Sequence, residues 1–229
     1  MSAGIAFRAA LALLAAPLAL SPAHAQDAAA PVAPAAVAEP AKAPVPAEYV
    51  YVALTLPQGV VTLALDKTHA PLTTANFLKY VDSKKLDGAV FYRAMHLEHD
   101  PAQGLLQGRV LNAASLLPPV AHEPTSKTGI THVAGTVSMA RFAPGTARAD
   151  FMILISDMHA LDAEPGNDGK DPGAGFAAFG HVAAGMDVVK AIWNLPRSAT
   201  KGDGVMKGQI LESDVKILTA RRTKAPPAP

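Results

Sequence analysis

Arg93 is the residue of this sequence whose type and setting most directly imply chemistry. It follows Phe91 and Tyr92 in the stretch GAVFYRAMHL, residues 88 to 97, which otherwise has the texture of a half-buried strand. A guanidinium does not lose its proton in proteins, so placing one beside aromatic rings is costly unless something there requires it. The plainer alternative is that Arg93 forms an ion pair with a surface acid.

Other groupings of reactive residue types give weaker signals. His96, His99 and Asp100 fall close together but follow a strand, and histidine ligands usually need a third fixed partner, so we expect no metal. The loop over residues 161–175 is rich in acids and glycines but lacks the ordered D-x-[DN]-x-[DN]-G frame of a calcium loop. The chain also lacks G-x-S-x-G, G-x-G-x-x-G and P-loop motifs, which leaves hydrolase and nucleotide-binding functions without support.

The elements that must position Arg93 can be predicted from periodicity and turn residues. Two apolar, β-branched runs flank the turn residues 57–59, which predicts a β-hairpin. Pro71 suits the first turn of a helix that we expect to end near Lys85, and a second short helix is expected over residues 185–193. Strands are predicted over residues 48–56, 60–66, 89–95, 135–140, 150–156, 176–182 and 214–221.

Length and composition favour one domain with a self-sufficient core. The chain has 229 residues and no cysteine, so no disulfide can stabilise it. We place the domain at residues 48–221. Many short strands punctuated by glycine and proline, with two helices, favour an antiparallel sandwich or a closed barrel.

The N-terminal residues 1–25 have the pattern of a signal peptide: Arg8, an apolar run, and Ala-His-Ala at the end. The run is too short for a bilayer-spanning helix, which needs about 20 residues. We therefore expect export to the periplasm and no stable membrane insertion after cleavage, with a membrane tether as the alternative if the segment is not cleaved. Residues 26–47, rich in alanine and proline, predict a disordered linker, and residues 222–229 a disordered tail.

Net charge argues against nucleic acid as the main partner. The chain has 20 Lys+Arg and 19 Asp+Glu residues, and removal of residues 1–25 takes away Arg8 alone, which leaves the two signs balanced. A neutral protein has no electrostatic attraction for nucleic acid or anionic lipid.

The region from Tyr51 to Trp193 resembles the cyclophilin family of peptidyl-prolyl cis-trans isomerases in the order and spacing of its motifs. APLTTANFLKYV is similar to the family's A-P-x-T-x-x-N-F helix, and VFYRAM is similar to its F-H-R-V strand. GTVSMARFAPGTARADFMI resembles its G-x-x-S-M-A-N-x-x-P-N-T-x-x-x-Q-F-F-I segment, and AAFGHVAAGMDVVKAI its F-G-x-V-x-x-G-x-x-V-V-x-x-I ending. The resemblance implies an all-β fold with two helices: a closed eight-stranded antiparallel β-barrel capped by two α-helices, with a peptide groove on its outside.

The resemblance also implies a reaction, with Arg93 as the catalytic residue and no cofactor. Rotation about an X-Pro peptide bond must overcome a barrier of about 18 to 20 kcal/mol, because resonance makes the C–N bond partly double. Twisting localises a lone pair on the proline nitrogen, so a donor aimed at that nitrogen binds the twisted state more strongly than either planar isomer. The permanently charged donors of Arg93 suit this role.

Further site residues follow from the aligned motifs. Gln107 in GLLQG resembles the glutamine of the family's F-M-x-Q-G, which orients the arginine and contacts the peptide backbone; the stretch EHDPAQ before it is an insertion. Leu105 is then expected to line the proline pocket, which must be apolar because the pyrrolidine ring has no donor. Ala140 and Leu161 fall at matching groove positions, with ordinary barrel packing as the alternative.

Several residues depart from the family pattern. Arg141 and Phe142 stand where the family has an asparagine and a small residue, so the ring of Phe142 is expected to overhang the groove and narrow its specificity. Met152 replaces the second phenylalanine of F-F-I, and an unbranched methionine can still form an apolar wall. Ala160 replaces a rim tryptophan, and Phe176 a histidine.

Asp150 replaces the glutamine that precedes F-F-I in the family. If the family geometry holds, its carboxylate lies close to Arg93, where a salt bridge would fix the guanidinium but weaken its field on the substrate. We therefore predict that Asp150→Gln raises turnover.

Together these features predict a peptidyl-prolyl cis-trans isomerase that assists the folding of exported proteins. Its partners are expected to be proline-containing, unfolded or extended polypeptides, and the protein is expected to be a monomer. The alternative is a proline-peptide-binding chaperone or adaptor of the same fold with little or no turnover. A structural role, with the groove blocked by Phe142, is a third option.

Overall fold

The computed structural model of this chain describes residues 45–227. The predicted signal peptide, most of the predicted linker and residues 228–229 lie outside the described residues. The strands are β1 (Tyr49–Leu56), β2 (Gly59–Asp66), β3 (Val90–His96), β4 (Gly104–Arg109), β5 (Thr136–Met139), β6 (Phe151–Leu154), β7 (Ala177–Ala184), β8 (Ile210–Lys216) and β9 (Thr219–Thr223). The helices are α1 (Pro71–Asp82), α2 (Thr125–Thr128) and α3 (Met186–Trp193).

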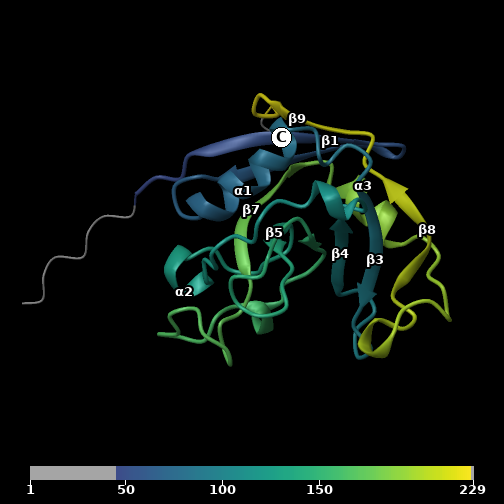
Figure 1. The fold of residues 1–229 in the computed structure, drawn as a ribbon. Coiled ribbons are helices and arrows are strands. Elements are labelled where there is room, and N and C mark those ends of the chain that lie inside the picture. The colour runs from purple at the N-terminus through teal and green to yellow at the C-terminus, as the bar shows by residue number, and fades with distance from the viewer. Residues whose placement is uncertain (1–44, 228–229) are drawn as a thin grey trace, which may run out of the picture. The chain divides into compact units, whose positions relative to one another are not determined.

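All nine strands belong to one antiparallel sheet, in the order β8-β3-β4-β6-β5-β7-β2-β1-β9. Figure 1 shows the sheet curled, with β9 beside β1 and β8 beside β3. Within residues 45–227 no ladder joins β8 to β9. The predicted antiparallel β fold is therefore confirmed, but the sheet is a nine-stranded half-barrel and not a closed eight-stranded barrel.

A bend at Ile217 and Leu218 explains both the ninth strand and the absence of a ladder between β8 and β9. Ile217 N donates to Ala89 O at 2.7 Å, whereas Leu218 N donates to Thr55 O at 2.8 Å. Consecutive residues thus bond to opposite ends of the sheet, and the single strand predicted over residues 214–221 becomes β8 and β9. The two edge strands, β8 and β9, are therefore consecutive in the chain and are connected directly through Ile217 and Leu218.

The sequence pattern did not predict β4, which carries part of the site. Its GLLQGR sequence contains two glycines, and glycine is depleted in strands. Gly108 is required by packing, because a Cβ there would lie 2.9 Å from the ring of Phe151. Because packing requires glycine at this position, the strand propensity of the sequence does not indicate β4.

Aromatic side chains fill the inside of the curl. Phe77 of α1 lies 5.4 Å from both Phe151 and Phe179, measured between ring centroids, and Phe91 lies 5.6 Å from Phe151. The helix α1 packs against β2, β7 and β9, and α3 packs against β2, β3 and β4. These contacts commit the inner face of the sheet to the core and leave the outer faces of β3, β4 and β6 available for a site.

Both predicted helices are present, with Pro71 at the first turn of α1 as expected. The four-residue α2 adds a third helix, too short to show a periodic pattern. No helix within residues 45–227 combines the length and the hydropathy needed to cross a bilayer. At the C-terminal end β9 runs to Thr223, so regular structure extends two residues past the predicted domain boundary at 221.

Candidate active site

A β-bulge in β3 turns Arg93 to the outer face of the sheet. The register of β3 shifts between Phe91 and Arg93 in its pairing with both β4 and β8. Phe91 and Ala94 both lie in the main core, although strict alternation places residues three apart on opposite faces. The extra residue, Tyr92, resets the alternation, and Arg93 points into the groove instead of the core.

Two glutamines hold the guanidinium of Arg93 in place. Nη1 donates to Gln107 Oε1 at 2.9 Å, and Nε and Nη2 both donate to Gln209 Oε1, at 2.9 and 2.7 Å. The ladder pairs Arg93 directly with Gln107, which explains how residues separated by an insertion meet. Burial lowers the pKa of Arg93 and interaction with Tyr92 opposes this, but a guanidinium stays charged throughout the working pH range.

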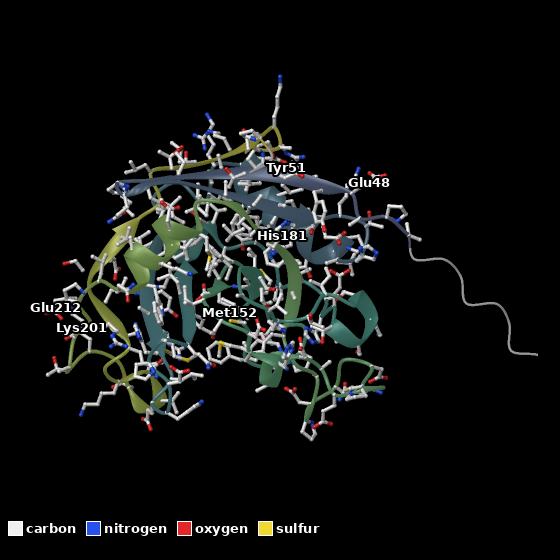
Figure 2. All side chains as sticks on the ribbon, turned by 180° about the vertical axis from the view of Figure 1, so that it is seen from behind. Glu48, Tyr51, Met152, His181, Lys201 and Glu212 are labelled. Carbon is white, nitrogen blue, oxygen red and sulfur yellow. The ribbon has the colours of Figure 1, made fainter. Side chains whose placement is uncertain are left out.

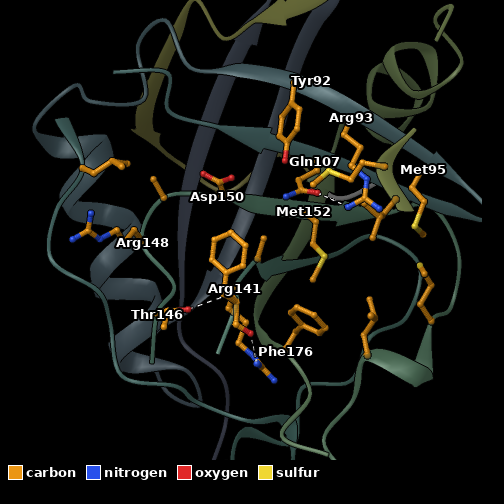
Figure 3. A pocket seen from close by; sticks show the side chains of 18 of the residues that line it. Tyr92, Arg93, Met95, Gln107, Arg141, Thr146, Arg148, Asp150, Met152 and Phe176 are labelled. Carbon is orange, nitrogen blue, oxygen red and sulfur yellow. Dashed lines mark hydrogen bonds between the residues drawn. The ribbon is translucent and has the colours of Figure 1, made fainter. Parts of the chain in front are cut away.

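A cavity of about 600 Å³ opens beside Arg93. Figure 3 shows the side chains of β3, β4 and β6 that converge on it. All the residues that the sequence assigned to the site line this one cavity: Arg93, Leu105, Gln107, Ala140, Arg141, Phe142, Asp150, Met152, Leu161 and Phe176. The structure thus brings the predicted set together, and the role of each residue remains a prediction.

The floor of the cavity is a small apolar cluster separate from the main core. Leu105, Met152 and Leu154 form its buried centre, and Leu161 and Phe176 pack against it. The alternation of β4 and β6 explains the separation, because their intervening residues Leu106 and Ile153 face the main core. This arrangement gives an apolar hollow directly beside a fixed cation.

Arg141 lines the cavity but is committed to the loop over residues 161–175. It forms a bidentate ion pair with Asp171 at 2.9 Å and donates to the backbone oxygens of Gly175 and Phe142. Its guanidinium also lies 5.1 Å from the ring centroid of Phe176. Arg141 therefore fixes this loop to the rim of the cavity. Its position in the sequence did not predict this structural role.

Phe142 stands at the mouth of the cavity with 97% of its surface exposed. A ring that blocked the groove would be packed against the groove walls and largely buried. The option that Phe142 closes the groove is therefore wrong, and the ring is available to a ligand.

The predicted salt bridge between Arg93 and Asp150 is absent. Among residues 45–227 Arg93 bonds only to neutral glutamine oxygens, and Figure 3 shows Gln107 beside it with Asp150 farther along the cavity wall. Asp150 precedes β6 and faces the end of β4; burial raises the pKa of Asp150, and Arg109 opposes that rise. The reason for Asp150→Gln to raise turnover is thereby removed.

Four residues of the site were not predicted from the sequence. Met206, Met95 and Met158 line the cavity. Gln209, from the segment before β8, does not line it but bonds to Arg93. Alternation along β3 could have indicated Met95, which lies two residues after Arg93. Gln209 left no local signal, because its contact with Arg93 spans 116 positions.

Ser138, His132 and Asp162 form a hydrogen-bonded chain, and Asp162 directly follows the cavity residue Leu161. His132 Nε2 is 2.8 Å from Ser138 Oγ, and His132 Nδ1 is 2.7 Å from Asp162 Oδ1. Serine, histidine and aspartate in this order can form a nucleophile with its base, but Ser138 and His132 are both 0% exposed. No substrate can reach this serine, so the chain serves to fix the turn that carries Leu161 onto β5.

His96 is engaged in packing. Its ring stacks on Trp193 with centroids 3.6 Å apart, and its two nitrogens face the backbone oxygens of Pro101 and Trp193. No three His, Cys, Asp or Glu side chains within residues 45–227 are placed to share a metal ion.

A family model described as "Cyclophilin type peptidyl-prolyl cis-trans isomerase/CLD" matches residues 50–221. The chain is 33% identical over 175 residues to the peptidyl-prolyl cis-trans isomerase cyp18 of Streptomyces antibioticus, covering 73% of this chain and 98% of that protein. It is 33% identical over 143 residues to peptidyl-prolyl cis-trans isomerase A of Dickeya dadantii, covering 62% of this chain and 70% of that one.

Among solved structures, a cyclophilin-type peptidyl-prolyl cis-trans isomerase of Cryptosporidium parvum matches with a TM-score of 0.59. The match covers 78% of this chain and 100% of that chain at 16% sequence identity. A second structure of that protein, in the presence of the dipeptide Ala-Pro, matches with a TM-score of 0.58 over 76% of this chain and 99% of that one, again at 16% identity. At this identity the likeness shows a shared fold.

Proposed function

This chain belongs to the cyclophilin-type peptidyl-prolyl cis-trans isomerase family, and we propose that it rotates X-Pro peptide bonds in the cavity beside Arg93. One observation carries the assignment of the site: a guanidinium held by neutral amide oxygens at the edge of an apolar hollow. The hollow receives the proline ring, and the guanidinium meets the nitrogen of that ring.

The free donors of Arg93 supply the catalytic interaction. Within the described part of the chain, three of its five N–H groups are bonded to glutamine oxygens, which leaves one N–H on Nη1 and one on Nη2. The nitrogen of a planar X-Pro bond has no lone pair to accept them, because resonance delocalises it. The nitrogen of a half-rotated bond does, so these donors stabilise the transition state more than either isomer.

The cavity walls are suited to varied sequences. Four methionines line the cavity, and their unbranched, polarizable side chains adapt to different apolar surfaces: Met95, Met152, Met158 and Met206. A lining of this kind supports unfolded or extended proline-containing polypeptides as substrates, since such chains present many different residues around proline.

The competing function is a binding module that holds proline-containing peptides without turning them over. Both functions use the same hollow. They therefore predict different rates of isomerisation but the same affinity for the peptide. The intact, outward-facing Arg93 favours the enzyme, because a purely apolar hollow would suffice for binding.

The test is the isomerisation rate of a short X-Pro peptide with wild-type protein, Arg93→Ala and the control Arg197→Ala, whose side chain is exposed and outside the cavity. We expect Arg93→Ala to lower kcat/KM by about a hundredfold and Arg197→Ala to leave it within about twofold. Equal, low rates for wild type and Arg93→Ala, with peptide binding retained, would identify a binding module.

Export to the periplasm is supported by the signal-peptide pattern of residues 1–25, and the substrates would then be exported proteins. Expression of the full chain in a Gram-negative host, followed by mass measurement of the periplasmic fraction, tests this. A mature protein that begins at Gln26 supports export; a full-length protein confined to the cytoplasm contradicts it.

A further inference from the structure

We propose that Gln209 is a positioning residue for Arg93, which aims the two remaining N–H groups of the guanidinium at the substrate nitrogen. This inference rests on the proposed function of the cavity but adds a residue and a region of the chain that the family motifs do not include. Gln209 does not line the cavity, so it acts on the reaction only through Arg93.

The backbone of Gln209 is fixed next to its target. Ala94 N donates to Gln209 O at 2.9 Å, and the following residue, Ile210, pairs with Arg93 in the ladder between β3 and β8. This anchoring occurs at the β-bulge, where the lost register would otherwise leave Arg93 poorly supported. The side chain of Gln209 therefore reaches the guanidinium from a backbone that is itself bonded to β3.

The contacts of Gln209 determine the rotation of the guanidinium plane. Its Oε1 accepts from Nε at 2.9 Å and from Nη2 at 2.7 Å, which grips one edge of the planar group. Gln107 alone provides a single bond, to Nη1, about which the group could still pivot. With one edge and one corner held, the free N–H groups have a defined direction, which is the condition for a preorganised donor.

The neutrality of Gln209 matters as much as its position. A carboxylate at the same place would hold the same edge but would oppose the positive charge that the reaction uses. An amide oxygen fixes the guanidinium without cancelling that charge. Surface arginines commonly form ion pairs with carboxylates. The guanidinium of Arg93 is instead held by the side-chain amides of two glutamines.

The segment that carries Gln209 is built to hold its shape. Figure 2 shows Lys201 beside Glu212, where Lys201 Nζ donates to Glu212 O at 2.7 Å and ties the start of the segment to β8. Gly202 has φ +87°, and a Cβ there would lie 2.5 Å from Met206 O, so this tight turn requires glycine. The segment presents Met206 to the cavity and Gln209 to Arg93 as one unit.

Three variants test the proposal: Gln209→Ala, which removes the grip; Gln209→Glu, which keeps the shape and adds a charge; and Gln58→Glu, a matched charge change in the exposed turn before β2. We expect Gln209→Ala to lower kcat/KM on an X-Pro peptide by about tenfold, mainly through kcat. We expect Gln209→Glu to lower kcat at least as much, and Gln58→Glu to have no effect.

A double-variant cycle shows whether the effect passes through Arg93. In an Arg93→Ala background, Gln209→Ala should cause no further loss of rate, because the group that it positions is gone. An additional tenfold loss in that background would overturn the proposal, as would a Gln209→Ala protein with wild-type kcat.

A readout independent of activity is the NMR signal of the Arg93 Nε–H. We expect a resolved, exchange-protected signal in the wild type and in Gln209→Glu, and its loss in Gln209→Ala with the overall spectrum unchanged. Retention of that protection in Gln209→Ala would contradict the proposal. If the wild type lacks isomerase activity but shows this pattern, the proposed function fails while the positioning of Arg93 by Gln209 stands.

Discussion

Phe142 is the most exposed of the large apolar side chains in the described residues, and it lines the cavity beside Arg93. We predict that Phe142→Ala lowers kcat/KM about fivefold for peptides with a bulky apolar residue before proline, because such a residue covers the ring and buries apolar area. Peptides with glycine at that place should lose little.

The stability of Phe142→Ala should stay within about 0.5 kcal/mol of wild type, since an exposed ring makes few contacts. The control is Val60→Ala, which removes another exposed apolar side chain, from β2. Equal losses for both classes of peptide would show that the ring plays no part in substrate choice.

Individual site residues were predictable where they belong to a local motif. Arg93, Gln107 and Leu105 lie in short strands whose neighbours identify them, and all of them line the cavity. Gln209 and the true neighbours of Asp150 were not predictable, because both depend on contacts between strands distant in sequence. The salt bridge predicted for Asp150 was wrong because a family geometry was carried over to a carboxylate whose pKa is influenced by Arg109 and not by Arg93.

At the scale of elements, α1 depends on a residue far outside its own sequence. Its N-cap position, Ala70, provides no side-chain bond, and Glu123 takes over by accepting from Leu72 N at 3.1 Å and from Thr73 N and Oγ1 at 2.7 and 2.6 Å. A buried carboxylate at a helix N-terminus satisfies free N–H groups and interacts favourably with the helix dipole.

We therefore predict that Glu123→Ala lowers the free energy of unfolding by about 2 kcal/mol and Tm by about 6 °C. The exposed Glu212→Ala serves as the matched control and should leave Tm unchanged. Thermal unfolding by circular dichroism measures both. A Tm for Glu123→Ala within one degree of wild type would show that Glu123 does not stabilise α1.

The elements differ in how much the sequence reveals about them. The hairpin of β1 and β2 and the helices α1 and α3 were predictable because each has a clear period and turn residues at its ends. The strand β4 and the break between β8 and β9 were not. The first contains glycines demanded by neighbouring rings, and the second follows from a switch of partners at Ile217 and Leu218 that leaves the apolar pattern intact.

At the scale of the whole domain, three histidines make stability depend on pH: His132, which is fully buried, and His122 and His181, which are more exposed. Burial lowers the pKa of His122, His132 and His181 below the ordinary value of 6.5; hydrogen bonds to Ala174 O and Asp162 oppose this for the first two, and Asp66 for the third. The unfolded chain then binds protons that the folded domain does not, so stability is present above pH 6.5 and is lost as the pH falls below it. Asp150 has the opposite effect: burial raises its pKa, so this one group stabilises the folded domain more at lower pH.

We predict that Tm is lower at pH 5.5 than at pH 7.5. Differential scanning calorimetry of the domain at both values, at constant ionic strength, measures the difference. A Tm that is unchanged or higher at pH 5.5 would show that these histidines do not control the pH dependence of stability.

A comparison of rate with affinity for one X-Pro peptide tests whether Arg93 acts on the twisted bond. NMR exchange at saturating protein gives the isomerisation rate of the bound peptide, and titration gives its dissociation constant, for wild type and for Arg93→Ala. Because we propose that the donors of Arg93 act on a nitrogen that accepts them only when the bond is twisted, we predict a loss of about a hundredfold in rate and a change of less than about threefold in the dissociation constant. A rate that survives the substitution, or a loss of affinity as large as the loss of rate, would show that Arg93 does not act selectively on the twisted bond.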